Sequence, residues 1–440
     1  MLPTRVGMDG KALRANVPRS AQAAWDAPSG RDPLAQLSAV FATLLPDLRD
    51  LRIARMTRSP FAFLRGSAAL MAADLATTPS TGILAQISGD AHLANFGGYA
   101  SPERRLVFDV NDFDESVRGP WEWDLKRLAT SVVLAGMEHG LRAAAYEPAV
   151  RRAVAVYRDR TASYAALPVL DRWYAQLSLS AAMRASLDPR ARRLWQRAAR
   201  DARSRTTLAL LPSITQRTQN QLRFTDAPPL LEHLDDGAHG NDLAERILET
   251  YRASLRHDAR MLLARFRVVD VVRKVVGVGS VGTWCALVLL LDTDGNPLLL
   301  QLKEARASAL EPYVGAQPYA THGERVVAGQ RMMQATSDAL LGWAQVDERS
   351  LYVRQYRDMK TSPDLRALDA EALADVAAHC AWALARAHAR TGDPRAVAAY
   401  VGRGEVFVDA IAAFARSYAE QVIHDHASFV AVAHTLRQPA

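Results

Sequence analysis

Residues 268–303 restrict the fold of this chain most strongly, because they are rich in valine and leucine and contain two turn signals, at 277–282 and 292–297. Short apolar runs that alternate with Gly- and Asn-containing turns are typical of consecutive antiparallel strands. We therefore expect three antiparallel strands here. A helical pattern follows, and after it one or two further strands, so the sequence predicts a small β-rich lobe over 266–360.

The rest of the chain is dominated by helical periodicity, with apolar residues recurring every three to four positions. Helices are expected at 32–51 and at about 63–76, and two long helices over 370–390 and 406–437. Because 440 residues exceed what one compact core usually spans, at least two lobes are expected. The fold class that these patterns predict is α+β.

Arginine supplies nearly all of the positive charge, since the formal net charge is +7 and the sequence contains only five lysines. This composition resembles a coding bias more than a selected basic patch. The densest basic stretch, 151–205, also carries four aspartates, which is typical of a solvated helical face. The composition therefore argues against a nucleic-acid partner.

Cysteine content and hydropathy limit the cellular setting. Two cysteines, Cys285 and Cys380, are too few for a disulfide framework or a cysteine-rich metal site. No apolar stretch approaches the roughly 20 residues that a bilayer span requires, and the N-terminal residues lack the charged-then-apolar pattern of a signal peptide. A cytoplasmic location without a membrane partner is expected.

The segment 89–95, Gly-Asp-Ala-His-Leu-Ala-Asn, follows a short apolar run at 83–87 that is expected to be a strand. Phosphoryl transfer requires a carboxylate that orients and deprotonates the acceptor hydroxyl, together with oxygen ligands for Mg²⁺. Asp90 and Asn95 provide these side chains at the spacing of kinase catalytic loops. Asp90 is therefore the candidate catalytic base, and Asn95 is a candidate metal ligand. The alternative is a polar turn in which both side chains cap local backbone.

An acidic segment ends the next expected strand, 106–110, and places Asp109, Asp112, Asp114 and Glu115 within seven residues. Such a cluster repels itself, and a divalent cation is its natural counter-charge. In kinases, an Asp at the end of the strand after the catalytic loop is the second metal ligand. Asp109 fits the usual spacing and Asp112 fits the Asp-Phe-Gly motif, so both are candidates. The alternative is an acidic surface loop.

The turn at 277–282 reads Gly-Val-Gly-Ser-Val-Gly and fits the pattern G-x-G-x-x-G. A dinucleotide-binding fold requires a helix after this turn, whereas here strand-like runs stand on both sides. A glycine-rich loop between antiparallel strands is the kinase arrangement, in which the backbone covers the nucleotide phosphates. The candidate nucleotide-binding residues are Gly277, Gly279, Ser280 and Gly282. The alternative is a purely structural hairpin.

Lys303 lies at the end of the third expected strand. Kinases carry at this position the lysine that binds the α- and β-phosphates. In a chain with only five lysines, the presence of one here is informative. Its expected partner is a glutamate on the following helix, which is Glu324 by spacing, with Glu311 as the alternative.

Five segments together resemble the bacterial domain-of-unknown-function family 2252, and the resemblance extends over nearly the whole chain. They are Ser-Pro-Phe-Ala-Phe-Leu-Arg-Gly (59–66), Gly-Asp-Ala-His-Leu-Ala-Asn-Phe-Gly (89–97), Phe-Asp-Val-Asn-Asp-Phe-Asp-Glu (108–115), Pro-Trp-Glu-Trp-Asp-Leu-Lys-Arg-Leu (120–128) and 277–303. The family has no established activity, so the resemblance implies kinase-like motifs and no particular substrate. Asp124 resembles the Asp that begins a helix in aminoglycoside and choline kinases, which implies that it anchors the catalytic loop.

The order of these segments differs from that of ordinary kinases, in which the glycine-rich hairpin precedes the catalytic loop. This order suggests a circularly permuted, two-lobed protein-kinase-like fold with a helical insert. The expected parts are an N-terminal arm (1–30), the catalytic-loop half of the large lobe (31–150), the helical insert (151–265), the small β-rich nucleotide-binding lobe (266–360) and C-terminal helices that pack on the large lobe (361–440).

The leading hypothesis is an ATP- and Mg²⁺-dependent phosphotransferase that acts on a hydroxyl of an unidentified small molecule. Two alternatives stay open: a nucleotide-binding pseudokinase without turnover, and a metal-dependent hydrolase that uses His92 with the aspartates. The sequence has no G-x-S-x-G elbow, which argues against a serine hydrolase.

Overall fold

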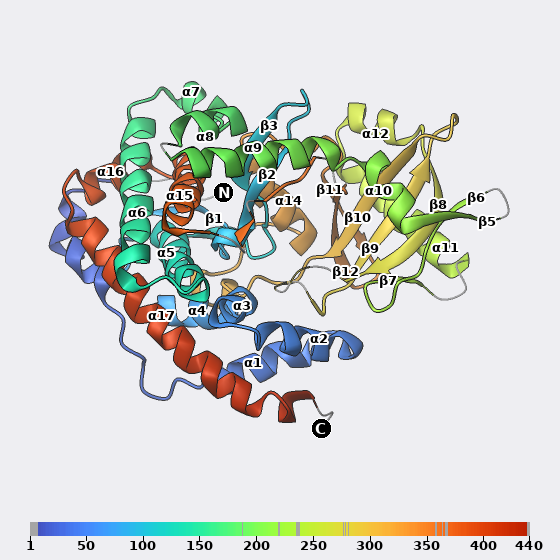
Figure 1. Cartoon of the computed structure of the whole chain (residues 1–440). Helices are drawn as coiled ribbons and strands as arrows, with labels where there is room; N and C mark the ends of the chain where they lie inside the picture. The colour runs from blue at the N-terminus through green and yellow to red at the C-terminus, as the bar shows by residue number, and fades with distance from the viewer. Residues whose placement is uncertain are drawn as a thin grey trace.

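The computed structural model of the chain has an α+β architecture, in which a helical region lies beside a region built on a six-stranded antiparallel sheet (Figure 1). This confirms the predicted α+β class. The structure describes residues 8–186, 188–218, 221–234, 238–275, 277, 279, 281–356, 359–362, 364–365 and 368–437. Within these residues, no helix is both long enough and apolar enough to cross a lipid bilayer.

The sheet contains the three consecutive antiparallel strands expected over 268–303, and two more strands follow them as predicted. The order across the sheet is β11-β12-β10-β9-β8-β7. The strands are β7 (Leu231–His233), β8 (Arg267–Lys274), β9 (Cys285–Leu291), β10 (Pro297–Glu304), β11 (Gly342–Val346) and β12 (Arg349–Gln355). Between β10 and β11 lie α13 (Glu311–Val314) and α14 (His322–Met333), the helix predicted near 322–338.

The two faces of the sheet are covered by different helices, because successive side chains of a strand point to opposite faces. Val288 of β9 belongs to a core cluster with α11 and α12, whereas its neighbours Leu287 and Leu289 belong to a separate cluster with α10. These helices are α10 (Thr207–Ile214), α11 (Ala238–Ser254) and α12 (His257–Leu263).

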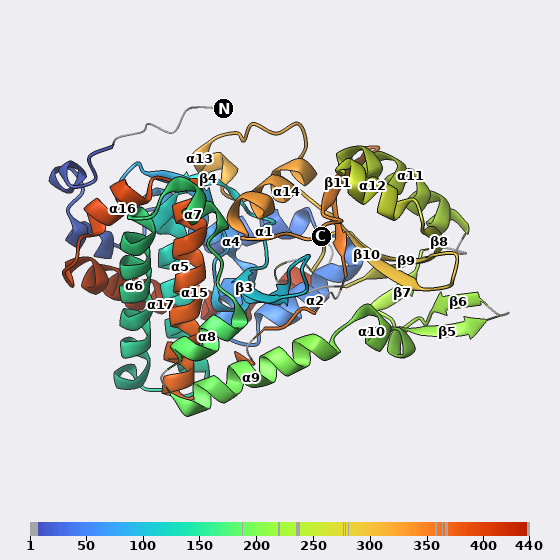
Figure 2. The same cartoon turned by 90° about the horizontal axis from the view of Figure 1, so that it is seen from above.

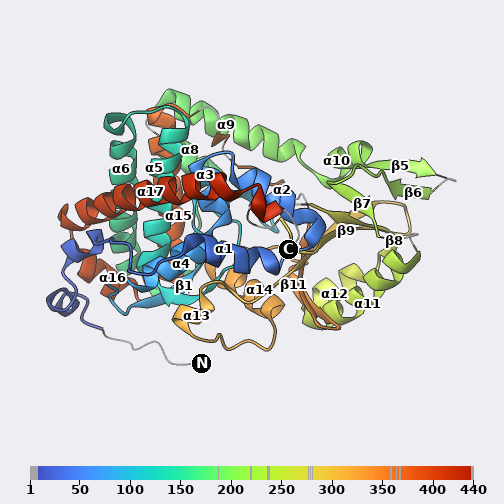
Figure 3. The same cartoon turned by 90° about the horizontal axis from the view of Figure 1, so that it is seen from below.

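Helix α5 (Trp121–Glu138) is at the centre of the helical region, since every residue from 121 to 136 is buried. A helix that is buried all round must be enclosed by other elements. Helices α6 (Ala143–Ala165), α15 (Ala370–Thr391) and α17 (Val406–Val432) enclose it. Figures 2 and 3 show the C-terminal α15 and α17 beside α5 and α6. The two predicted C-terminal helices are confirmed, and they complete a core that the N-terminal half begins.

Each of the two helices predicted near the N-terminus is divided in two. Pro46 has no backbone N–H to donate and begins a new helix, so the segment expected as one helix over 32–51 forms two. The next helix ends at Gly66, where the hydroxyl of the following residue, Ser67, donates to the carbonyl oxygens of Phe63 and Leu64. The four helices are α1 (Pro33–Ala42), α2 (Pro46–Met56), α3 (Pro60–Gly66) and α4 (Ala68–Ala76).

Residues 8–30 of the predicted N-terminal arm pack against the C-terminal helices. Arg14 Nε donates to the carbonyl oxygen of Tyr400 at 2.9 Å, and the rings of Trp25 and Tyr418 meet edge-to-face with centroids 4.9 Å apart. This part of the arm is therefore held by the fold. The elements involved are the 3₁₀ helices η1 (Ala12–Ala15) and η2 (Arg19–Ala23) and helix α16 (Pro394–Val401).

Two short antiparallel pairs determine where the chemical motifs lie. The pairs are β1 (Leu84–Ile87) with β4 (Val117–Pro120) and β2 (Phe96–Ala100) with β3 (Leu106–Val110), the 3₁₀ turn η3 (Leu93–Asn95) lying between β1 and β2. Strands β1 and β3 were predicted, whereas β2 and β4 were not. The segment 88–95 connects β1 to β2, and the segment 111–116 connects β3 to β4. Because β1 pairs with β4 and β2 with β3, these two connecting segments lie next to each other.

The segment 151–265 is less uniformly helical than predicted, because it contains a pair of strands and also β7 of the large sheet. Its first half packs on the helical region through α9, and its second half packs on the sheet through α11. The remaining elements are α7 (Val169–Tyr174), α8 (Leu179–Ala185), α9 (Pro189–Ser204), β5 (Thr215–Thr218), β6 (Gln221–Phe224) and the terminal 3₁₀ helix η6 (Thr435–Arg437).

Candidate active site

The loop after β1 is fixed by the first turn of α5. Asp124 Oδ2 accepts a hydrogen bond from the backbone N–H of Ser88 at 2.7 Å, and Oδ1 accepts one from that of Gly89 at 2.9 Å; His388 Nε2 lies 3.2 Å from Oδ2. Gly89 has a φ of +76°, and a Cβ there would lie 2.5 Å from the carbonyl oxygen of Glu115, so only glycine fits. The anchoring role expected for Asp124 is confirmed.

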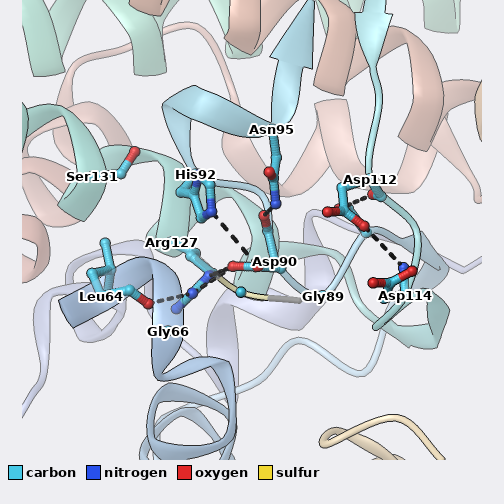
Figure 4. A network of polar contacts seen from close by, with 12 residues as sticks. Leu64, Gly66, Gly89, Asp90, His92, Asn95, Asp112, Asp114, Arg127 and Ser131 are labelled. Atoms are coloured by element: carbon cyan, nitrogen blue, oxygen red, sulfur yellow. Dashed lines mark hydrogen bonds and ion pairs between the residues drawn. The ribbon is translucent and has the colours of Figure 1, made fainter. Parts of the chain in front are cut away.

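Asp90 follows this anchored turn and lies against an arginine. Arg127 Nε donates to Asp90 Oδ1 at 2.6 Å, and His92 Nε2 lies 3.6 Å from Asp90 Oδ2 (Figure 4). Burial raises the pKa of Asp90 to about 7; the charge of Arg127 opposes this rise, and the carboxylates of Asp112 and Glu115 add to it. A carboxylate with a pKa near neutrality can exchange a proton with an acceptor hydroxyl at physiological pH.

His92 is a neutral, buried neighbour of this carboxylate. Burial lowers the pKa of His92 well below 6.5, and the charges of Arg65 and Arg127 lower it further. Its ring packs edge-to-face against Phe61, with centroids 6.3 Å apart. His92 also lines the small cavity beside Asp90, so it forms a buried, neutral part of the wall of the site.

The structure distinguishes between the two aspartates that were candidate metal ligands. Asp112 lines the same small cavity as Asp90 and Asn95. Asp109, in contrast, is fully buried on β3, where Arg386 of α15 donates to both of its carboxylate oxygens at 2.8 and 2.9 Å. Asp109 therefore has a structural ion pair, and Asp112 is the aspartate that faces the site. Spacing from the loop favoured Asp109 because it carries no information about Arg386, which pairs with that carboxylate.

Asn95 and Asp112 offer oxygen atoms to the cavity. Asn95 Nδ2 donates to the backbone oxygen of Asp90 at 2.9 Å, which leaves its amide oxygen for a ligand. Burial raises the pKa of Asp112, the neighbouring Asp114 adds to the rise, and Lys303 opposes it. Among the described residues, no three His, Cys, Asp or Glu side chains are grouped as a complete metal site. Mg²⁺ commonly uses one or two protein oxygens together with phosphates and water, so this donor pair suits it.

The glycine-rich turn between β8 and β9 reaches over Asp90. A Cβ built on Gly279 would lie 3.9 Å from Asp90 Oδ2 and 3.0 Å from the carbonyl oxygen of Arg65. Gly277 and Gly279 line the cavity with Asp90. Gly282 has a φ of +96° and lies against Leu44, so its role is to turn the chain. The fourth candidate of this turn, Ser280, lies outside the described residues.

Lys303 also reaches the cavity, but its ion-pair partner differs from the predicted one. Its Nζ forms an ion pair with Asp114, which also accepts from the hydroxyl of Tyr352 at 2.9 Å. Glu324 instead accepts from the backbone N–H of Ala320 at 3.0 Å, at the start of its own helix. The prediction of Glu324 assumed that the first turn of α14 faces Lys303. In the structure, the acidic segment after β3 lies closer to Lys303.

One cavity of about 140 Å³ joins the two sets of motifs. Its lining includes Asp90, Asn95 and Asp112 from the N-terminal part, and Gly277, Gly279 and Lys303 from the sheet region. The loop at 89–95 and Lys303 are about two hundred positions apart in the sequence, and only the packing of the two regions brings them together.

Several charged and polar residues at this site were not predicted. Arg127 is held between Asp90 and the carbonyl oxygen of Leu64, and Arg354 and Gln301 complete the cavity wall. Arginine is so common in this chain that its presence alone carries little information. One signal was available for Arg127, because it follows Asp124 by three positions and therefore shares its helix face.

The raised pKa of Asp90 makes stability depend on pH. Its ordinary value is 3.8 and its value in the fold is about 7, so folding favours the protonated form. This contribution is full below about pH 4 and is lost as the pH rises through about 7. We expect the free energy of unfolding of the wild type, relative to that of Asp90→Asn, to fall between about pH 4 and pH 7. Chemical denaturation of both proteins measures this, and a difference that is constant with pH would contradict it.

The comparisons with known proteins agree with the resemblance seen in the sequence. The model of the family DUF2252, described as "Uncharacterized protein conserved in bacteria", matches residues 44–432. Comparisons with curated proteins and with solved structures gave no match. The matched range includes the anchored loop, the acidic segment, the glycine-rich turn and Lys303. The chain therefore belongs to the DUF2252 family.

Proposed function

We propose that this protein is an ATP- and Mg²⁺-dependent phosphotransferase that acts on the hydroxyl group of a small molecule. The observation that carries the proposal is the 140 Å³ cavity, in which Asp90, Asn95 and Asp112 face Lys303 and the glycine-rich turn. Catalysis of phosphoryl transfer consists mainly of positioning and electrostatic stabilisation, and these side chains are the types that it requires.

We further propose that the fold is kinase-like and circularly permuted. Three features support this: a glycine-rich turn between two antiparallel strands, a lysine on the next strand, and a helix before the last two strands of the sheet. The loop of Asp90 and the β2–β3 hairpin come earlier in the chain. After β12 the chain returns through α15, which packs against β1 and so beside that loop.

Each side chain has a distinct part in this proposal. Asp90 Oδ1 is held by Arg127, so the carboxylate is fixed with Oδ2 towards the glycine-rich turn, where it would orient and deprotonate the acceptor hydroxyl. Asn95 and Asp112 would hold Mg²⁺, whose charge would offset that of the phosphates. Lys303 would bind the phosphates, and the backbone at Gly277 and Gly279 would cover them.

A nucleotide-binding protein without turnover is the second candidate, and one observation favours it. Asp90 already forms an ion pair with Arg127, and Lys303 already forms one with Asp114. Both pairs would have to exchange partners during a reaction. Measured turnover decides between the two candidates.

The proposal is tested first by nucleotide binding. We expect Mg²⁺·ATP to raise the thermal unfolding temperature of the wild type by several degrees, because a ligand that binds only the folded state stabilises it. Lys303→Met is expected to weaken the affinity by about tenfold or more, since it removes a charge-assisted phosphate contact. Lys11→Met, the same change at an exposed lysine, is the matched control. An unfolding temperature unaffected by Mg²⁺·ATP in all three proteins would refute the proposal.

A further inference from the structure

A second, larger cavity adjoins the first on the side of Asp90. Its volume is about 500 Å³, and it shares Arg65, Asp90, Asp112 and Gly279 with the smaller cavity. Such a volume is typical of sites for small molecules. Helix α1 forms an apolar wall, and the start of α4 and the segment 304–313 form the others. The cavity is placed where an acceptor could reach Asp90 without entering the space between Lys303 and the glycine-rich turn.

Apart from Asp112, which is proposed above to hold Mg²⁺, the carboxylates on its wall already have partners within the protein. Asp90 pairs with Arg127, Asp114 with Lys303, Glu304 with Arg306, and Glu115 accepts from the backbone N–H of Ala309 at 2.7 Å and from the hydroxyl of Ser308 at 3.0 Å. These four carboxylates therefore do not require a cationic ligand to balance their charge.

Two arginines on the same wall, Arg52 and Arg65, have no carboxylate partner among the residues that the structure describes. Within the described part of the chain, no carboxylate oxygen lies within 4.0 Å of Arg52 or Arg65. Arg52 is only 6% exposed and donates to the carbonyl oxygens of Gly66, Gly279 and Val281. Its Nε has no partner among the described residues, and neither has the buried Nε of Arg65.

Burying such charges without a counter-ion is costly. Burial lowers the pKa of Arg52 to about 10, and the carboxylates of Glu115 and Asp90 oppose this. An anion bound between the two guanidinium groups would offset part of this cost. The two guanidinium groups therefore provide the protein side of a site for an anion.

The start of helix α4 adds backbone donors to this wall. Ser67, its N-cap residue, turns its hydroxyl back to the carbonyl oxygens of Phe63 and Leu64 and makes no cap. In the part of the chain that the structure describes, the N–H groups of Ala68 and Ala69 have no acceptor, and both residues line the cavity. An uncapped helix start attracts negative charge.

We propose that the acceptor is an anionic hydroxyl compound with an apolar part, held by its phosphate or carboxylate group against Arg65, Arg52 and the start of α4. Its hydroxyl then reaches Asp90, and its apolar part lies along α1. This inference rests on the proposed phosphotransferase function. The terminal phosphate of the nucleotide is the other source of an anion for these donors, and the experiment separates the two.

The experiment measures the binding of inorganic phosphate to the full-length protein by titration calorimetry, alone and with saturating Mg²⁺·AMP-PNP. If the site serves the acceptor, phosphate binds in both cases with affinities that agree within about threefold. Phosphate binding that Mg²⁺·AMP-PNP abolishes, while Mg²⁺·ADP leaves it intact, would assign the donors to the nucleotide and overturn the inference.

Two variants link that binding to the named residues. Arg65→Gln is expected to weaken phosphate binding by about tenfold or more, because a charge-assisted contact is lost. Ala69→Asp places a carboxylate at the helix start, where it favours the helix and occupies the anion site, so phosphate binding is lost in a folded protein. Arg58→Gln, at an exposed arginine, is the control. Wild-type phosphate affinity in both site variants would overturn the inference.

The phosphate and nucleotide titrations distinguish the two proposals. If Mg²⁺·AMP-PNP binds and phosphate does not, the inference about the acceptor fails while the proposed function stands. If Mg²⁺·AMP-PNP does not bind, the proposed function fails, and with it the assignment of the anion to an acceptor.

Discussion

Asp90→Asn is expected to reduce phosphoryl transfer by about 10²- to 10⁴-fold, because it removes the group that accepts the hydroxyl proton in the proposed reaction. Asparagine keeps the shape of the side chain and can still accept a hydrogen bond from Arg127, so the loop anchored by Asp124 should keep its conformation. Affinity for Mg²⁺·ATP should stay within a few-fold of the wild type. Steady-state kinetics and nucleotide titration of the two proteins measure both quantities.

The control for this prediction is Asp294→Asn, the same change at an exposed position in the turn between β9 and β10. It should leave transfer unchanged. If Asp90→Asn transfers phosphate as fast as the control, Asp90 is not the base. If the wild type binds Mg²⁺·ATP without any turnover, the protein is a nucleotide-binding protein and not an enzyme.

Arg386→Met is expected to lower the free energy of unfolding by about 3–5 kcal/mol, because it leaves the buried carboxylate of Asp109 without its counter-ion. Arg386 is fully buried and also donates to the carbonyl oxygen of Met333, at the end of α14. The pair joins β3, α14 and α15, so both regions of the molecule depend on it. Chemical denaturation of the variant and the wild type measures the loss.

Two further variants test whether this loss of stability comes from the buried ion pair. Arg416→Met removes an exposed pair with Glu147 and should cost less than about 1 kcal/mol. The double variant Arg386→Met/Asp109→Asn should recover part of the loss, since no unpaired charge is left buried. A loss below about 1 kcal/mol in Arg386→Met would contradict the structural role of the pair.

The elements that could be predicted from the sequence are those with strong local signals. The three strands over 268–303 and the helices at 370–390 and 406–437 have long apolar patterns, and all five are confirmed. Strand β2 was missed because it contains Gly97 and Gly98, which are poor strand formers. Its two glycines pack closely against Thr361, a residue far away in the sequence.

The candidate site was predictable in its residue types and less so in its pairings. Asp90, Asn95 and Lys303 were found because each stands next to a recognisable strand or turn, and the structure places all three on one cavity. The choice between Asp109 and Asp112 needed the position of Arg386, which is 277 residues from Asp109. No local pattern contains that information.

The sequence by itself determined the chemistry that this protein carries: an Asp–Asn loop, an acidic strand end, a glycine-rich turn and one lysine, each defined by neighbours within a few positions. Tertiary structure alone decided which charges meet. Ion pairs form between whichever buried groups the packed helices and strands bring together, so Lys303 pairs with Asp114 and Asp109 with Arg386. Arg52 and Arg65 remain without a carboxylate partner for the same reason, among the described residues, and that is a property of packing and not of sequence spacing.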